Sequence, residues 1–320
     1  MKRIFFSLIG AIILLVFGCQ KDPYPYISLK DTQKIDSAVH PKITNAAFIY
    51  KNNIYYVADF DLPVTQITSD GSAMRFVKMS HDHTKFAYLN SSSNIVVVDN
   101  NGKNITTLYQ YTQVKSFDWS ANDKTLYILN GNSMSYYGPV MNLPGITYPG
   151  ITNGSTLAVL SASVSLQGDF AYVVHGYNFI DGDKYELIIK PANNGAIIEY
   201  DNPEDDVYTM GYVNFSTNKQ DLVVGYKDST IPSDILNSVR VFTGLKSYPD
   251  FSFGDVCTPT YNSNLKYMVA GRSGDIGNTT LVPTAIYLGD GPVYPNTNIA
   301  LTKILSKYSV TGSNFYTDWK

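Results

Sequence analysis

One unit recurs along this chain: a strand, a polar turn led by Ser or Asn, and a second apolar strand. Two clear copies lie at 77–90 and 117–130, and weaker copies follow around 165–173, 214–224 and 260–269. Their turn anchors, at residues 80, 120, 167, 216 and 262, are 40 to 49 residues apart. That period suits a four-stranded blade of a β-propeller. It constrains the fold strongly, because repeats of this kind bury their apolar faces only by packing on their neighbours.

Further short strands complete the units. After residue 44 no sustained 3.6-residue periodicity is found, and β-rich runs alternate with turn residues, which is typical of all-β proteins. Third strands are predicted at Asn94–Asp99, Tyr185–Lys190, Ser238–Phe242 and Thr284–Leu288. Fourth strands are predicted at Ile105–Leu108, Ile197–Tyr200 and Ile299–Thr302.

The two ends of the repeat region complement each other. The first unit has its second, third and fourth strands at Ala46–Tyr50, Asn53–Val57 and Val64–Thr68. It lacks a first strand, and the C-terminal segment 314–320 resembles the strand 117–120 and then stops. We therefore predict an all-β fold: a six-bladed β-propeller of four-stranded antiparallel blades, closed by the C-terminal strand joining the first blade. Seven blades stay open as an alternative, if a degenerate unit lies in 136–163 or 270–300. Within these stretches we interpret Tyr137–Gly150 and Gly271–Asn298, both rich in Gly, Pro and Asn, as insertions.

The N-terminus has the pattern of an export signal. Lys2 and Arg3 precede an apolar run, Ile4–Phe17, which is too short to span a membrane and suits the apolar region of a signal peptide. The run ends in Val16-Phe17-Gly18-Cys19, which resembles the lipobox of bacterial lipoproteins, although Phe17 stands where a small residue is usual. The resemblance implies that Cys19 becomes the mature N-terminus and carries a diacylglycerol and a further acyl chain such as palmitate. Several acyl chains anchor a protein stably, where one alone is marginal.

The residues after Cys19 bear on location. Gln20 stands where an Asp would retain a lipoprotein in the inner membrane, and Cys19-Gln20-Lys21-Asp22 resembles a surface-export tag of some Gram-negative bacteria. We expect an outer-membrane, lipid-anchored protein, displayed on the cell surface or otherwise on the periplasmic face. The predicted organisation is a signal peptide at 1–18, a Pro-containing tether at 19–44 and the propeller domain at 45–320.

The repeats also resemble a known family. A strand, an S-x-D-x-x turn and an apolar strand, followed by IxVxDxxG and xITxL, is similar to the WD40-like repeats of the TolB-like propellers. The segments Ser80–Tyr88 and Asn94–Leu108 match best, and Phe117–Leu129 is the second copy. The Pro usual after the Ser is His81 or Ala121 here. The resemblance implies a β-propeller over 45–320 and leaves the subfamily open.

Charge and cysteine content exclude several classes. The net charge is −3, and it becomes −5 without residues 1–18, because 22 Lys and Arg then face 27 Asp and Glu. A nucleic-acid partner is therefore not expected. Two Cys exclude a disulfide scaffold and four-Cys zinc sites, and Cys257 is expected to be a small buried apolar residue.

No catalytic, metal or cofactor site is predicted. His81-Asp82-His83 occupies a hairpin-turn slot of the repeat, where such residues satisfy the local backbone. Asp181-Gly182-Asp183 with Glu186 lacks the ligand spacing of a calcium loop. The sequence also lacks a Gly-x-Ser-x-Gly elbow, a phosphate loop and a dinucleotide fingerprint. Enzymatic activity is left open, with a non-enzyme favoured.

Tyrosine is unusually frequent, with 26 residues. Most strand tyrosines are expected to pack between neighbouring blades. Tyrosines in loops would suit protein or glycan binding, because they offer contact area at low entropic cost. The candidate ligand-binding residues are Tyr137, Tyr148, Tyr177, Tyr261 and Tyr294.

These patterns favour a binding platform for an envelope protein or peptide partner, since the loops of a propeller converge at its central channel. The alternative is a glycan-binding or glycan-degrading surface protein, and a third candidate is a structural subunit of an envelope complex. Two carboxylates about 5–10 Å apart in a cleft would favour a glycan hydrolase.

Overall fold

The structure, a computed structural model, describes residues 44–319 with internal gaps. The gaps are 60–61, 121, 132, 138–155, 166, 179–181, 194, 202–207, 216–220, 229–235, 237, 244–245, 248–255, 263–266, 274–279, 288–297, 301–307, 309 and 312–315. The predicted signal peptide, Cys19 and the tether up to residue 43 lie outside the described residues.

The described strands form six antiparallel sheets, numbered here in chain order. The first contains β1 (Thr44–Tyr50), β2 (Asn53–Asp59), β3 (Thr65–Gln66) and β24 (Thr317–Trp319). The second contains β4 (Arg75–Met79), β5 (Lys85–Leu89), β6 (Ile95–Asp99) and β7 (Thr106–Leu108). The third contains β8 (Val114–Trp119), β9 (Leu126–Asn130) and β10 (Ser133–Tyr137).

The remaining three sheets use the second half of the chain. The fourth contains β11 (Thr156–Val164), β12 (Phe170–Asn178), β13 (Gly182–Lys190) and β14 (Ile198–Asp201). The fifth contains β15 (Tyr208–Phe215), β16 (Leu222–Asp228), β17 (Ser238–Thr243) and β18 (Lys246–Ser247). The sixth contains β19 (Val256–Asn262), β20 (Tyr267–Ser273), β21 (Thr280–Tyr287), β22 (Asn298–Ala300) and β23 (Val310–Thr311), with β23 paired to β21.

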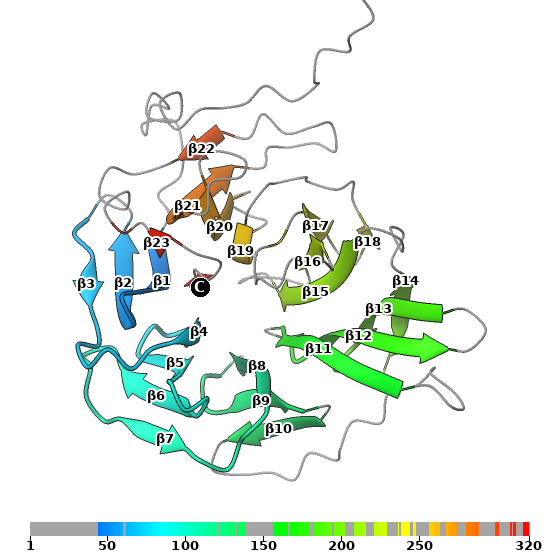
Figure 1. Cartoon of the computed structure of the whole chain (residues 1–320), viewed down its shortest axis with the longest axis horizontal. Coiled ribbons are helices and arrows are strands. Elements are labelled where there is room, and N and C mark those ends of the chain that lie inside the picture. Colours follow the sequence, from blue (N-terminus) through cyan, green and yellow to red (C-terminus); the bar gives the residue numbers. More distant parts are fainter. Residues whose placement is uncertain are drawn as a thin grey trace, which may run out of the picture.

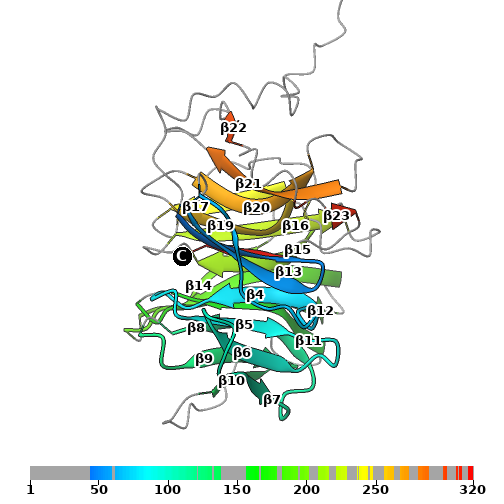
Figure 2. The same ribbon diagram turned by 90° about the vertical axis from the view of Figure 1, so that its left-hand side faces the viewer.

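The sheets stand around a common centre. In Figure 1 the first strand of each sheet lies nearest the axis, later strands follow outward, and the C-terminal strand lies in the middle of the ring. Figure 2 views the same ring from its edge. This radial arrangement of antiparallel sheets is a β-propeller, so the predicted all-β propeller class is confirmed.

The ends of the chain meet in the first sheet. Strand β24 pairs with β1 through the partners Ala46↔Trp319, Ala47↔Asp318 and Phe48↔Thr317. The predicted joining of the C-terminal strand to the first sheet is thus confirmed. It gives β1 a neighbour on the side where it would otherwise have an open edge.

The two stretches interpreted as insertions also contain strands. Strand β10 ends at Tyr137, where the first stretch begins, and β11 follows that stretch. Strand β20 extends into the second stretch as far as Ser273, β21 lies within it, and β22 begins at Asn298. Among the described residues, these strands belong to the third, fourth and sixth sheets and form no separate sheet. The interpretation of Gly271–Asn298 as an insertion was too broad, because β20 and β21 pair there, with Gly271 opposite Pro283. Residues 138–150 of the other stretch lie outside the described residues.

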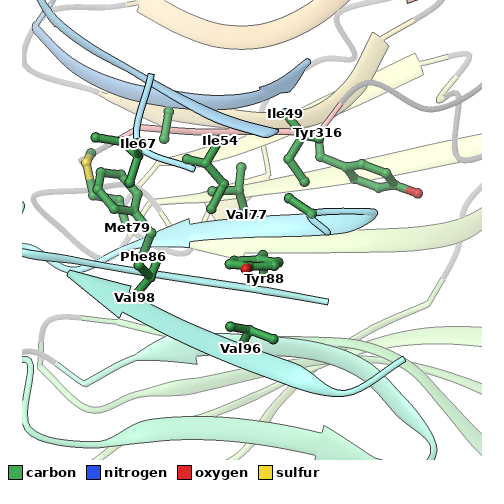
Figure 3. Packing of buried hydrophobic residues seen from close by; sticks show 12 residues of the cluster. Ile49, Ile54, Ile67, Val77, Met79, Phe86, Tyr88, Val96, Val98 and Tyr316 are labelled. Atoms are coloured by element: carbon green, nitrogen blue, oxygen red, sulfur yellow. The ribbon is translucent and has the colours of Figure 1, made fainter. Parts of the chain in front are cut away.

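Apolar packing is concentrated between neighbouring sheets. One cluster joins Ile49 and Ile54 of the first sheet to Met79, Phe86 and Val98 of the second (Figure 3). Four further clusters each span two consecutive sheets, from the second to the sixth. Because each face is covered only by its neighbour, no sheet could be stable alone.

Several strand tyrosines fill these interfaces, as predicted. Tyr88 is 1% exposed in the cluster of Figure 3, and Tyr172 is equally buried in the fourth sheet. Tyr316, directly before β24, is also 1% exposed in the cluster of Figure 3. The hydroxyl of Tyr88 lies 2.9 Å from that of Ser72, so its polar end has a partner.

The closing strand should contribute strongly to stability. Trp319 is 2% exposed, and its indole N–H donates to the Thr44 carbonyl at the opposite end of the domain. Trp319→Ala should lower the free energy of unfolding in urea by about 3–5 kcal/mol, because it leaves a cavity at the seam. Tyr109→Ala, at a side chain 72% exposed, is the control and should change it by less than about 0.5 kcal/mol. An equal loss of unfolding free energy in both variants would contradict a stabilising role for the closing strand.

Candidate functional site

The two ends of the ring differ in what they present. The innermost strands begin at one end, here called the mouth end, where Arg75 pairs with Leu89 and Val114 with Asn130. They finish at the other, the turn end, where the hairpin turns after Ser80 and Ser120 lie. Each end therefore collects equivalent loops from successive sheets.

A bulge recurs near the start of the innermost strands. Pairing shifts by one residue or more in five of them, at Arg75/Val77, Val114/Ser116, Val159/Ser161, Met210/Tyr212 and Cys257/Thr260. A bulge bends its strand and redirects side chains. Five bulges at one level of the ring therefore give the mouth end a different lining from the rest of the channel.

Below this level, a ring of polar side chains crosses the axis. It takes one residue from each innermost strand, and we call it the floor ring: Lys78, Asp118, Ser163, Asn214, Thr260 and Asp318. Five members are at most 3% exposed, and the Lys78 side chain is 13% exposed. Buried polar groups need partners inside the protein.

The floor ring supplies its own partners. The Lys78 ammonium donates to Asn214 Oδ1 at 3.1 Å and lies 3.4 Å from Asp318 Oδ1. The Ser163 hydroxyl lies 2.9 Å from Asp118 Oδ2 and 3.2 Å from Asn214 Oδ1. Asn214 Nδ2 donates to Thr260 Oγ1 at 3.0 Å. All six side chains thus belong to one hydrogen-bonded network.

The positive charge of the floor ring is carried by Lys78. Burial by itself would lower the pKa of this amine, but attraction to Asp318 and then to Asp118 outweighs it, and the pKa is raised. The charged form is therefore favoured in the folded protein. The ring contains one cation and two carboxylates, all within the same network.

Side-chain bonds to backbone join neighbouring innermost strands. Ser116 Oγ accepts from Ala162 N at 3.0 Å, and Ser161 Oγ accepts from Val213 N at 3.2 Å. Thr258 Oγ1 accepts from Thr317 N at 2.7 Å. The seam between the first and second sheets is bridged by Asp318, which accepts from Met79 N at 2.8 Å, and the next seam by the Trp119 indole donating to the Lys78 carbonyl. Hydrogen bonds between a side chain and the backbone of the next innermost strand therefore recur around the axis.

Above the floor ring lies a cavity of about 270 Å³, the mouth cavity. Its described lining includes four basic side chains and no acidic one: Arg75, Lys78, Lys115 and Lys227. Hydroxyl groups and apolar groups complete the wall, among them Ser116, Tyr212, Phe76, Leu160 and Leu236. Arg75 is exposed, so positive charge is presented at the cavity's outer edge.

Burial affects two titratable groups of this wall. It lowers the pKa of Lys115, whose ammonium donates to the Val159 carbonyl at 2.7 Å. It raises the pKa of Tyr212 well above 10, with a further contribution from the Asp318 and Asp118 charges. Tyr212 is therefore a neutral hydroxyl, and it donates to the Pro259 carbonyl.

Two cavity residues have unfavourable backbone angles. Phe76 has φ of 44° and Thr258 has φ of 40°, in a region that bulky or β-branched residues rarely occupy. Such strain is commonest at sites where geometry serves a function. Thr258 is held by its hydrogen bonds with Thr317, and the Phe76 ring packs edge-on against Phe117 and Tyr316.

The predicted tyrosine site is not assembled by the described residues. Tyr137 lies in strand β10, 39% exposed, opposite Leu126 at the turn end. Tyr177 lies in β12 opposite Thr156, so its backbone reaches the mouth end. Tyr148 and Tyr294 lie outside the described residues.

Tyr261 was wrongly placed in a loop. It belongs to strand β19, is 7% exposed and packs between the fifth and sixth sheets with Val241 and Met268. Burial, followed by the nearby Asp221, raises its pKa to about 12. The strand extends further toward the turn than expected, because its pairing with β20 continues to Asn262. Tyr137 and Tyr177 likewise belong to strand ends.

The interpretation of His81-Asp82-His83 as a turn is confirmed. Asp82 accepts from the Ser80 hydroxyl and from Thr84 N, and these bonds lower its pKa to about 2 although burial opposes the shift. His81 N and its ring Nδ1 lie 2.8 and 2.9 Å from Asp123 Oδ1 of the following turn. Cys257 is completely buried, as expected.

Sequence reasoning missed the floor ring and the basic residues above it. A signal was present: a polar side chain lies two positions before Ser80, Ser120, Ser165, Ser216 and Asn262, and again at Asp318 in the C-terminal copy, each within an otherwise apolar run. The cations of the mouth cavity had no such signal. Lys227 comes from a second strand, and only the folded ring brings it beside Arg75 and Lys115.

The carboxylates nearest the mouth cavity do not form an open pair. Asp118 accepts from Trp119 N at 3.0 Å and contacts Ser163, while Asp318 accepts from Met79 N and contacts Lys78. Both are buried below the cavity. This geometry is that of a structural network.

Of the comparisons with known proteins, only the one with solved structures found matches. No family model and no curated protein matches the chain. Among solved structures, TolB from Acinetobacter baumannii is similar, with a TM-score of 0.51 and 12% identity over 76% of this chain and 61% of that chain. The β-propeller domain of Cps50 (Swd1) from Myceliophteria thermophila gives a TM-score of 0.46 and 10% identity, over 69% of this chain and 70% of that chain. The likeness to TolB supports a shared β-propeller fold.

In the part of the chain that the structure describes, no helix is long and apolar enough to cross a membrane.

Removing the cation of the floor ring should destabilise the propeller. Lys78→Met leaves Asp318 and Asp118 buried without that charge, and it should lower the free energy of unfolding by about 3–5 kcal/mol. Lys103→Met, at an exposed turn position, is the matched control and should change it by less than about 0.5 kcal/mol. Urea unfolding at pH 8 measures both, and a Lys78→Met effect as small as the control's would refute the network's role.

The stabilisation by Lys78 should depend on alkaline pH. Because its folded pKa is raised above the ordinary 10.5, its contribution is full below that pH and is lost as the pH rises through the folded pKa. The stability gap between the wild type and Lys78→Met should therefore narrow in the alkaline range, above about pH 10.5. Urea midpoints of both proteins from pH 8 upward test this, and a constant gap would contradict it.

Proposed function

We propose that this chain is a lipid-anchored cell-envelope β-propeller that acts as a binding platform for a protein or peptide partner at the mouth cavity. One observation carries the proposal: a cavity of about 270 Å³ opens at the axis between strands of several sheets, with charged, hydroxyl and apolar groups in one wall. Convergent polar groups in a mostly preformed cavity are typical of binding sites. The propeller fold by itself is compatible with many functions.

The blade number is part of the proposal. We propose six blades, because the six sheets follow one another in chain order and the sixth bonds back to the first through Thr258 and Thr317. A closed ring of fixed size keeps the innermost strands at fixed distances, which preserves the shape of the mouth cavity.

Binding is favoured over glycan hydrolysis. A glycoside hydrolase needs two carboxyl groups flanking an open cleft. The described wall of the mouth cavity contains no carboxylate, and Asp118 and Asp318 are hydrogen-bonded beneath it. Its basic groups suit recognition, and the glycan-binding alternative has less support because the wall's aromatic Tyr212 donates its hydroxyl to backbone.

Anchoring is proposed from the lipobox alone. Cys19→Ala should move the protein from the membrane fraction to the soluble fraction of its native host, since the acyl chains would have no attachment site. Cys257→Ala is the matched control and should leave the protein in the membrane fraction. Immunoblots of separated fractions give the readout. Membrane retention of Cys19→Ala would refute lipid anchoring, and protease treatment of whole cells tests display on the surface.

Position-specific crosslinking tests the platform. A photoreactive amino acid replacing Val114, in the wall of the mouth cavity, should crosslink a discrete envelope protein in living cells. The same group replacing Ile105, which is 58% exposed on an outer strand, should not capture that protein. Adducts identified by mass spectrometry from position 105 but not from position 114 would contradict a platform at the mouth.

A further inference from the structure

We infer that the mouth cavity recognises an acidic peptide segment, and that Arg75, Lys115 and Lys227 contact its carboxylates. The inference rests on the proposed function and adds the chemistry of the ligand. It starts from a local contrast: the whole chain has a net charge of −3, whereas the described cavity wall has four basic side chains and no acidic one. A concave, low-dielectric wall concentrates such a field and attracts anions.

The three cations come from three different sheets. Arg75 begins β4, Lys115 is the second residue of β8, and Lys227 lies near the end of β16. Each position is at the mouth end of its strand, so the three side chains enter one cavity from different sides. Lys78, the fourth cation, is committed to the floor ring.

The bulge at Gly211 makes room for Lys227. A Cβ atom added at Gly211 would lie 3.2 to 3.5 Å from the Cε, Cδ and Cγ atoms of Lys227. The lysine stem therefore lies across the innermost strand β15 in the space that this glycine leaves. This packing brings a second-strand residue to the cavity wall.

Arg75 and Lys115 are oriented before any ligand binds. The Arg75 guanidinium stacks over the Phe76 ring at 4.9 Å, and its Nε donates to the Tyr316 hydroxyl at 3.2 Å. Lys115 is held by the Val159 carbonyl, and burial lowers its pKa. A carboxylate brought into the cavity would offset this cost of burying positive charge. Fixed charged donors also form the stronger hydrogen bonds to carboxylates.

The shape of the site favours a peptide over a small inorganic anion. The floor ring closes the channel below, so a ligand enters and leaves by the mouth as a loop tip or chain end. The volume of about 270 Å³ is near the lower limit of small-ligand pockets, about 300 Å³, which suits one or two side chains. Apolar groups from Phe76, Leu160 and Leu236 would pack against the aliphatic part of a peptide.

The test compares two peptides and two triple variants of the full-length chain, purified in detergent. Fluorescein-labelled hexaglutamate and hexaglutamine are the probes, read by fluorescence anisotropy. The site variant is Arg75→Gln with Lys115→Gln and Lys227→Gln. The control, Lys103→Gln with Lys124→Gln and Lys190→Gln, removes the same charge from exposed positions on other parts of the ring.

Hexaglutamate should bind the wild type about tenfold or more tightly than hexaglutamine, and the preference should weaken with salt. The site variant should lose this preference, and the control should keep it to within about twofold. Urea unfolding checks that both variants are folded. Gly211→Val, which displaces Lys227 without altering charge, should weaken hexaglutamate binding by an intermediate amount.

Three outcomes would overturn the inference. One is equal affinity for the two peptides, another is equal loss in the two triple variants, and the third is displacement of hexaglutamate by tripolyphosphate at lower concentration than by unlabelled hexaglutamate. The last would identify a small phosphate-type anion as the better ligand. Crosslinking from position 114 does not depend on ligand charge, so the platform proposal can stand or fall separately.

Discussion

The centre of the ring imposes the strongest physical constraint on this protein. Six innermost strands converge on one axis, where their side chains are removed from water and each polar group must find a partner within the protein. The floor ring meets this requirement by linking Lys78, Asn214 and Asp318 directly and the other members through them. Replacing one member by an apolar residue would leave the polar groups bonded to it buried without a hydrogen-bond partner. The network therefore favours one arrangement of the innermost strands over others.

Closure and the mouth cavity both depend on this arrangement. Asp318 belongs to the C-terminal strand, yet it bonds to Lys78 and to the Met79 amide in the second sheet. The closing strand is thus fixed by β1 on one side and by the axis on the other. Above it, bulges recur near the starts of the innermost strands, and basic side chains line the mouth cavity beside strained residues such as Phe76. The floor ring closes the channel beneath this wall.

Much of the fold could be predicted from the sequence, because its signals are local. The Ser-led turns, the short apolar strands and the missing first strand at residue 46 all follow from composition and period. Strand ends were less predictable. Residues near Tyr261 in the sequence are typical of a loop, but pairing with β20 extends the strand through it. The fifth and sixth sheets then bury its side chain. The candidate site was largely missed, since Arg75, Lys115 and Lys227 form no motif. Their common location depends on how three sheets are placed around the axis.

By itself, the sequence determined the repeat, the all-β class and the joining of the C-terminal strand to the first sheet, and it carries the N-terminal pattern from which we propose lipid attachment at Cys19. These features depend on spacing along the chain, which a strand-and-turn period records directly. Only the tertiary structure decided which polar side chains meet at the axis, how Lys78 is paired, and where basic groups gather. Those features depend on contacts between residues such as Lys78 and Asp318, 240 positions apart. Local sequence preferences do not specify contacts between residues so far apart in the chain. These contacts form only because the sheets are arranged in a ring.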